Sequence, residues 1–333
     1  MKKIRNYIIL LLFTVIVLYF TLKDNFSSIL NTILKMNPIW FIIALLLMLI
    51  GCMLKTLVLK NYVNQYNKDY SYSKALKLQL ESAFFNGITP FSSGGQPFQI
   101  IVLKNDGVKV GHSTNVIFIA SFIYQFSLFI ISTVCIIANQ FLHLFSPDSH
   151  IKYLSILGYV INIVFMAFLL LVIFNKKMKK KLVKFISKII RKMKFIKKRE
   201  ELVSKLEETT DVMEESSVLI RKDRHGFISC TIYDVLANIL YCSIPFFLGQ
   251  AMGLGTDISL INAIITSSYV ILIGFFVPIP GGTGGLEYAF VALFTNFISD
   301  PLAKSMMLVW RFVTYYLGVI VGGIVLNLDK KKK

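Results

Sequence analysis

Residues Asn86 to Phe98 read NGITPFSSGGQPF and interrupt a chain that is otherwise strongly apolar. A second interruption, VPIPGGTGGLEY, runs from Val277 to Tyr288. Proline and glycine are the residues least compatible with the interior of an α-helix. Neither stretch therefore predicts an ordinary membrane-spanning helix, and both must sit at breaks between shorter helices.

The composition around these breaks indicates a polytopic membrane protein. Of the 333 residues, 55% are apolar, and the mean hydropathy of +0.66 lies above the soluble range. A helix of about 20 apolar residues crosses the ~30 Å hydrocarbon core of a bilayer. Two apolar regions, 75–103 and 258–298, carry the interruptions. Six uninterrupted segments predict full spans at roughly 6–22, 38–59, 113–139, 151–174, 226–250 and 302–327.

Basic residues predict the orientation of these spans. Lys2, Lys3 and Arg5 precede the first span, segment 175–224 contains 17 Lys or Arg, and the chain ends in DKKKK. By the positive-inside rule all three regions, and hence both termini, are expected in the cytoplasm. Six full spans place both termini in the cytoplasm only if each interrupted region enters and leaves the membrane on the same side. The first region would then enter from the cytoplasm and the second from outside. Alternatively, each region crosses twice as two short helices.

The two interruptions share a frame of residues. Pro90, Gly94 and Gly95 each have a counterpart 190 residues later, at Pro280, Gly284 and Gly285. Paired Gly/Pro interruptions are typical of inverted-repeat transporters, whose substrate site lies between them. Broken helix ends also direct N–H groups toward anions such as a lipid phosphate. The alternative is that both runs are only kinks or tight packing points.

These patterns together predict the fold class. We expect an all-α polytopic membrane protein with six full spans plus two Pro/Gly-interrupted re-entrant helix pairs in an inverted repeat. The expected units are a first membrane half, a basic cytoplasmic helical hairpin and a second membrane half. They cover residues 1–174, 175–225 and 226–333, with the interruptions at 86–98 and 277–287.

The hairpin begins with a basic amphipathic helix. Apolar residues recur every three or four positions from Met178 to Ile196, and most of the other residues are lysines. Such a helix either lies on the anionic inner leaflet or only joins two spans and sets the topology. Residues 201–219 predict an acidic return helix.

Ionisable residues inside apolar segments usually mark function. Four stand out: Glu81, Asp234, Glu287 and Arg311. Arg311 is expected either to pair with Glu287 or Asp234, or to hold a phosphate with its planar guanidinium. Lys55 is expected to extend toward the inner membrane face and is not counted as a site residue.

Three motifs resemble one known family. TPFSSGGQPFQIIVLKNDGV, VPIPGGTGGLEYAF and RFVTYYLG are similar, in this order, to the signatures of the lysylphosphatidylglycerol synthase transmembrane family. The resemblance implies a bacterial plasma-membrane flippase that moves aminoacylated phosphatidylglycerol to the outer leaflet and confers resistance to cationic peptides. Family members with synthase activity carry a cytosolic transferase domain; this chain ends soon after its last span, so we expect no transferase. Many members also carry a basic residue and an acidic partner early in the third span. This chain reads NVIFIASFIYQF there and has no charged residue in that stretch.

The sequence leaves three kinds of function open. The first is a lipid flippase. The second is an aminoacyl or glycosyl transferase, or another component of a glycolipid or polyprenyl-phosphate pathway, and the third is a docking partner for a separate cytosolic synthase. Anionic lipids are the expected ligands, and no nucleic acid, cofactor, metal or catalytic residue is expected. Four cysteines without a CxxC pair and four scattered histidines indicate neither a disulfide framework nor a zinc site. The lipid-binding or translocation residues are expected to be Glu81, Pro90, Ser92, Ser93, Gly94, Gly95, Gln96, Asp234, Pro280, Gly281, Gly282, Gly284, Gly285, Glu287 and Arg311.

Overall fold

The structure, a computed structural model, describes residues 26–145, 150–192, 223–275 and 277–330. Within these ranges every regular element is a helix. In chain order they are α2 (Phe26–Lys35), α3 (Pro38–Val63), α4 (Tyr72–Ile88), η1 (Pro90–Ser92), α5 (Gly95–Asn105), α6 (Val110–Leu142), α7 (His150–Phe174), α8 (Lys176–Lys192), α10 (Arg224–Ala251), α11 (Leu260–Gly274), η2 (Pro280–Gly282), α12 (Gly285–Phe294), α13 (Asp300–Arg311), η3 (Phe312–Tyr316) and α14 (Leu317–Lys330).

Five of the six predicted full spans are confirmed as helices long and apolar enough to cross a membrane. They are Pro38–Val63, Val110–Leu142, Tyr153–Phe174, Arg224–Ala251 and Asp300–Leu328. The sixth predicted span, 6–22, lies outside the described residues, as does the predicted acidic return helix at 201–219. The protein is thus an all-helical multi-pass membrane protein, as its composition indicates.

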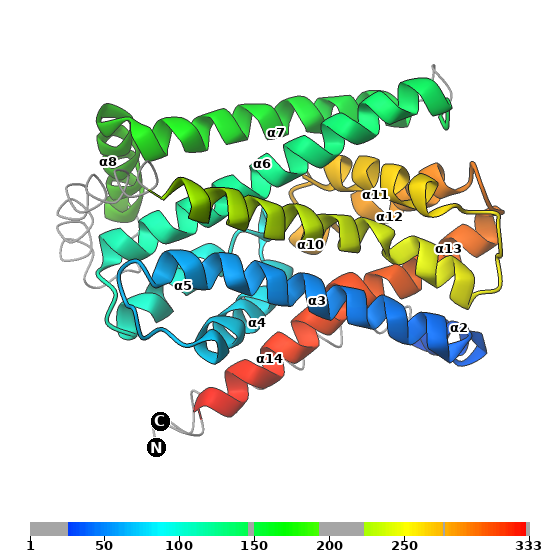
Figure 1. The fold of residues 1–333 in the computed structure, drawn as a ribbon, viewed down its shortest axis with the longest axis horizontal. Coiled ribbons are helices and arrows are strands. Elements are labelled where there is room, and N and C mark those ends of the chain that lie inside the picture. The colour runs from blue at the N-terminus through cyan, green and yellow to red at the C-terminus, as the bar shows by residue number, and fades with distance from the viewer. Residues whose placement is uncertain (1–25, 146–149, 193–222, 276, 331–333) are drawn as a thin grey trace.

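The long helices run side by side along the long axis of the molecule (Figure 1). Helix α10 packs against α3, α6 and α11, while α7 packs against α6 and α11. Small residues allow the closest approaches: a Cβ at Gly322 of α14 would lie 2.4 Å from the carbonyl oxygen of Leu80 in α4. Close backbone contact at small residues is the usual basis of helix packing inside a bilayer.

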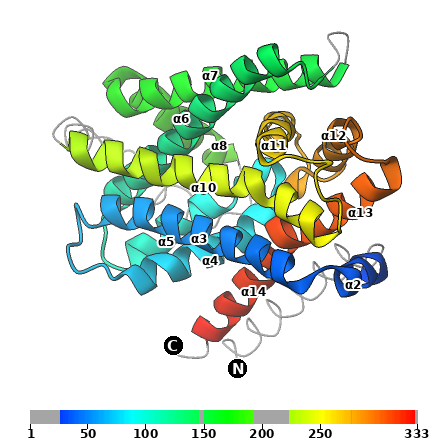
Figure 2. The same ribbon diagram turned by 45° about the vertical axis from the view of Figure 1, so that its right-hand side comes forward.

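Both interrupted regions fold as helix–turn–helix pairs. Helices α4 and α5 form the first pair and enter the bundle from the end that carries α8, which we term the basic end (Figure 1). Helices α11 and α12 form the second pair and enter from the opposite end (Figure 2). The broken turns η1 and η2 contact each other. The predicted breaks are therefore real, and the fold brings them together.

Buried side chains anchor the two pairs. In the second pair, Phe290 of α12 stacks on Trp310 of α13 with ring centroids 4.8 Å apart, and both rings are fully buried. In the first pair, the Tyr70 hydroxyl donates to Asp106 across 3.1 Å and ties the start of α4 to the end of α5. Burial, followed by the nearby Asp106 and Glu81 carboxylates, raises the pKa of Tyr70. These contacts fix α12 against α13 and hold the start of α4 beside the end of α5.

Candidate functional site

The two broken turns have nearly the same local geometry. Pro90 and Pro280 each begin a three-residue 3₁₀ turn, and the next residue is left-handed in both, with φ 55° at Phe91 and φ 64° at Gly281. In each turn a hydroxyl three residues after the start donates to the proline carbonyl across 2.9 Å, from Ser93 and from Thr283. The shared P-x-x-x-G-G frame therefore begins with a similar turn in both places. The two backbones differ at the glycine before the next helix, with φ −77° at Gly94 and φ 85° at Gly284.

Phe91 and Ser92 depart from the usual residue choice at left-handed positions, with φ 55° and φ 50°. Left-handed backbone disfavours residues with a Cβ, at roughly 1–2 kcal/mol each, and the equivalent positions of the second turn hold Gly281 and Gly282. The Phe91 side chain is 60% exposed. Strained backbone of this kind often occurs at ligand sites and switch regions, which makes the turn a candidate functional position.

The start of α5 is capped by two residues that the sequence analysis did not single out. The backbone N–H of Gly94 donates to Thr89 Oγ1 across 2.7 Å, and that of Gly95 donates to Asn86 Oδ1 across 2.8 Å. A Cβ at Gly95 would lie 2.5 Å from the Asn86 amide, which explains the glycine. The first donors of this broken helix are thus occupied by the chain itself, rather than directed toward an external anion as predicted.

Arg311 and Glu287 form a buried ion pair. Arg311 Nε lies 2.8 Å from Glu287 Oε1, and the side chains are 3% and 19% exposed. Glu287 Oε2 also accepts from the N–H of Gly284 across 2.5 Å, so the same carboxylate caps α12. The guanidinium donates from Nη2 to Thr283 Oγ1 across 3.4 Å. Of the two partners considered from the sequence, the structure selects Glu287.

Tyr315 joins the two interrupted regions. Its hydroxyl donates to the carbonyl oxygen of Gly87 in α4 across 2.9 Å, and the Arg311 guanidinium lies 4.3 Å above its ring. On the other side, a Cβ at Gly281 would lie 2.3 Å from the same ring. One side chain therefore contacts both halves of the chain and the buried cation.

A local change in the last span places this tyrosine. Residues Phe312–Tyr316 form one turn of π-helix between α13 and α14, directly after Arg311. A π-turn adds one residue to the helix and rotates the side chains that follow; such turns are frequent at functional sites. No sequence pattern predicted this π-turn, although Tyr315 lies within the RFVTYYLG motif.

The junction of η1 and η2 is accessible and carries polar groups beside the exposed apolar side chains of Phe91 and Ile279. Ser92, Ser93, Thr283 and Gly284 are exposed, whereas Gly281 and Gly282 are buried behind them. Backbone that is not helical is tolerated at membrane depth only where protein buries it or where it lines a wet cavity. Hydroxyl groups and turns of backbone at the junction thus offer hydrogen-bonding groups to a polar ligand.

A second polar network crosses the interior and does not include Arg311. Lys55 Nζ of α3 donates to Asn238 Oδ1 across 3.2 Å and lies 4.7 Å from the centre of the Tyr124 ring. The amide of Asn238 donates to Asp234 Oδ2 across 3.0 Å and to Ser127 Oγ across 2.7 Å. The prediction that Lys55 simply extends to the membrane face is wrong, because α10 and α6 supply polar partners inside the bundle.

The predicted site residues therefore separate into three places. The two Gly/Pro turns, Glu287 and Arg311 gather around the junction, Asp234 belongs to the interior network, and Glu81 is buried in α4. Gln96 lies in the first turn of α5. Among the described residues, no group of three or more His, Cys, Asp or Glu side chains is placed to hold a metal ion.

Comparison with known proteins adds the family. Residues 7–322 match the family described as Lysylphosphatidylglycerol synthase TM region, a span that includes both interruptions and Arg311. The chain belongs to this family.

Two curated members are similar along most of their length. The UPF0104 membrane protein of Archaeoglobus fulgidus is 24% identical over 300 residues, which cover 89% of this chain and 88% of the relative. The UPF0104 membrane protein of Pyrococcus horikoshii is 21% identical over 337 residues, 98% of each chain. Their names describe membrane proteins, and the resemblance drawn from the three sequence motifs is confirmed at the level of the family.

Proposed function

We propose that this protein is a lipid transporter that moves an anionic or aminoacylated phospholipid, such as aminoacylated phosphatidylglycerol, between the leaflets of a bacterial plasma membrane. The observation that carries the proposal is the junction of η1 and η2, where two 3₁₀ turns that begin alike, each at a proline followed by a left-handed residue, meet beside the Arg311–Glu287 pair. Such a transporter would contribute to resistance against cationic peptides by lowering the negative charge of the outer surface.

The repeated turn geometry supports an inverted repeat. The two helix pairs approach from opposite ends of the bundle and break at equivalent residues. In this arrangement α4–α5 and α11–α12 are re-entrant pairs, and the basic end faces the cytoplasm by the positive-inside rule. A lipid head group would then pass between two elements that are structurally alike but face opposite sides.

The ion pair suggests how an anionic head group is handled. Arg311 is nearly inaccessible, and the Glu287 carboxylate neutralises its charge. A lipid phosphate that reaches the junction would compete with this carboxylate for the guanidinium, whose planar fork matches phosphate oxygens. Release of Glu287 would free the first donor of α12 as well, because the same carboxylate caps Gly284.

A transport assay tests the proposal. The purified protein is reconstituted into liposomes that carry fluorescent phosphatidylglycerol, lysyl-phosphatidylglycerol, phosphatidylcholine or a polyprenyl phosphate, and the fraction reaching the other leaflet is measured by chemical quenching. Faster movement of an anionic or aminoacylated lipid than in empty liposomes supports the proposal. Equal rates with and without protein, across the whole lipid panel, refute it.

Matched glycine variants test the repeat within the same assay. A Cβ at Gly94 would lie 2.7 Å from Thr89 Oγ1, while Gly284 has φ 85°, so leucine at either position distorts one broken turn. Both Gly94→Leu and Gly284→Leu should slow transport to the rate of empty liposomes. Gly253→Leu, at another left-handed but open position in the α10–α11 loop, is the control. Loss in only one of the two turn variants contradicts the inverted repeat.

A further inference from the structure

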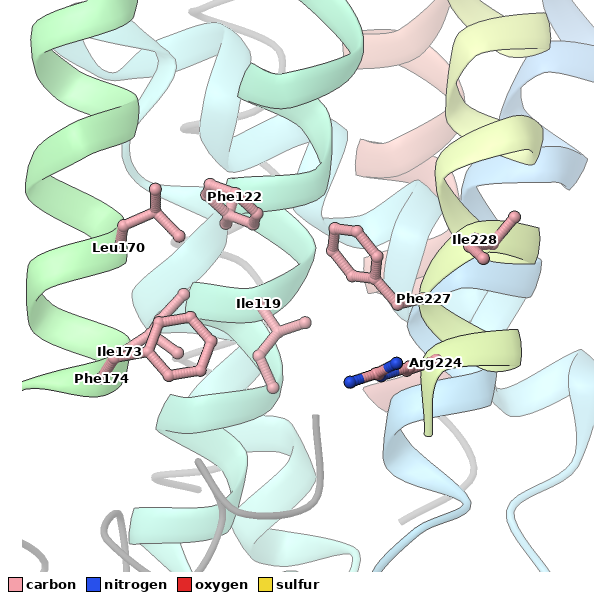
Figure 3. A pocket seen from close by; sticks show the side chains of 8 residues that line it. All are labelled: Ile119, Phe122, Leu170, Ile173, Phe174, Arg224, Phe227 and Ile228. Atoms are coloured by element: carbon pink, nitrogen blue, oxygen red, sulfur yellow. The ribbon is translucent and has the colours of Figure 1, made fainter. Parts of the chain in front are cut away.

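A separate apolar pocket lies at the basic end, between α6, α7 and α10 (Figure 3). Its volume is about 360 Å³, within the range of roughly 300–1,000 Å³ that is usual for small-ligand sites. Ile119 and Phe122 of α6, Leu170 and Ile173 of α7, and Phe227 of α10 form its walls. None of these residues belongs to the junction of η1 and η2.

One charged group lines this pocket. Arg224 is the first residue of α10, its side chain is exposed, and Figure 3 shows its guanidinium directed toward the space between Phe227 and Ile119. Among the residues that the structure describes, no hydrogen bond or ion pair engages this guanidinium. The pocket therefore combines an apolar interior with a cation available at one end.

The start of α10 holds this cation in place. Asp223 caps the helix by accepting from the N–H of Gly226 across 2.8 Å, and its other oxygen accepts from Gln65, two residues after the end of α3, across 3.2 Å. Both carboxylate oxygens are thus engaged in fixing the helix end. The N-terminus of the 28-residue helix α10 adds its positive dipole beside Arg224.

The pocket has an exposed apolar rim. Phe174 and Ile228 stand at its rim, 38% and 55% exposed, on helices that qualify as membrane spans. Aliphatic and aromatic walls suit a hydrocarbon chain, and an arginine at the end of a span suits the phosphate of the same molecule. Lysine-rich α8, which packs against α7, adds positive charge nearby.

We propose that this pocket binds one anionic phospholipid from the leaflet at the basic end, with an acyl chain between α6, α7 and α10 and the phosphate on Arg224. The site is lateral to the junction and would supply lipid to it. In that respect the inference rests on the transport function proposed above, although the binding itself does not require transport.

The experiment measures lipid preference at the pocket. Phe227→Trp introduces a fluorophore into the pocket wall of the full-length protein, in a Trp40→Phe background that removes the half-buried native tryptophan. The other native tryptophan, Trp310, is buried, and its signal is subtracted with the Trp40→Phe protein alone. Quenching is compared between liposomes that contain brominated phosphatidylglycerol and liposomes that contain brominated phosphatidylcholine at equal mole fraction. Phe168→Trp, on the exposed face of α7 and outside the pocket, is the control.

The inference predicts stronger quenching by phosphatidylglycerol at position 227, with a relative affinity on the order of fivefold for one basic residue at an anionic lipid. Arg224→Gln should abolish the preference, and Arg224→Lys should keep most of it. Gel-filtration profiles establish that these variants fold.

Equal quenching by the two lipids at position 227, or a preference that survives Arg224→Gln, overturns the inference. A preference shared by position 168 also overturns it, because the effect would then belong to the whole surface. Lipid preference without any transport leaves the pocket site standing and refutes the transport function. Transport without a lipid preference at position 227 refutes the pocket site and leaves the transport function standing.

Discussion

Replacing Glu287 with glutamine separates the charge of the buried pair from its shape. Glutamine keeps the size of the side chain and an oxygen that can still accept from the Gly284 N–H, so the cap of α12 is retained. The substitution removes the negative charge that lies 2.8 Å from Arg311 Nε. The Arg311 side chain is 3% exposed. Leaving a buried charge without its partner costs about 3–5 kcal/mol.

The structure also ranks the related variants. Arg311→Met leaves Glu287 behind, but this carboxylate is 19% exposed and sits at a helix N-terminus, so its loss of partner should cost less. The double variant removes both charges and is expected to recover most of the stability, since apolar replacements of buried pairs are often nearly neutral. Lys304→Gln, in an exposed ion pair with Asp300, is the control and should cost about 0–1 kcal/mol.

The assay is equilibrium unfolding in mixed detergent micelles, followed by circular dichroism, for the two single variants and the double variant. The coupling energy from this cycle should be at least ~1.5 kcal/mol, the lower end for close charge pairs. Strictly additive single and double variants would refute the reasoning, because they would show that the two charges do not stabilise each other in the folded protein.

Three further predictions use the same measurement. Gly281→Ala should destabilise the protein by about 2–4 kcal/mol, because it adds left-handed strain and a clash with the Tyr315 ring. Gly253→Ala, at an open position with φ 77°, should cost only the strain. Similar losses of stability in the two variants would show that the ring contact is unimportant. Tyr315→Phe removes one hydrogen bond between the two interrupted regions and should cost about 1 kcal/mol while slowing lipid transport, and unchanged transport would argue against a role in coupling the halves. Lys55→Met should destabilise by about 1–3 kcal/mol because buried Asp234 loses a neighbouring cation, and adding Asp234→Asn should restore stability; no restoration would contradict the interior network.

Local sequence patterns determined the helices and their breaks. Apolar runs of sufficient length predicted five spans that the structure confirms, because length and hydropathy are properties of a segment by itself. Proline and glycine in the P-x-x-x-G-G frame predicted both broken turns, since they act on the backbone at their own positions. Membership of the family was likewise visible in three short motifs.

Only the tertiary structure decided which distant residues meet. The choice of Glu287 over Asp234 as partner of Arg311 depends on how α12 and α13 are rotated about their axes. The π-turn after Arg311 changes the direction of the side chains that follow it, and no sequence signal predicted this turn. The bond from Tyr315 to Gly87 joins residues 228 positions apart, and Lys55 finds Asn238 at a separation of 183. Such contacts follow from the register and rotation of packed helices, which no local pattern specifies.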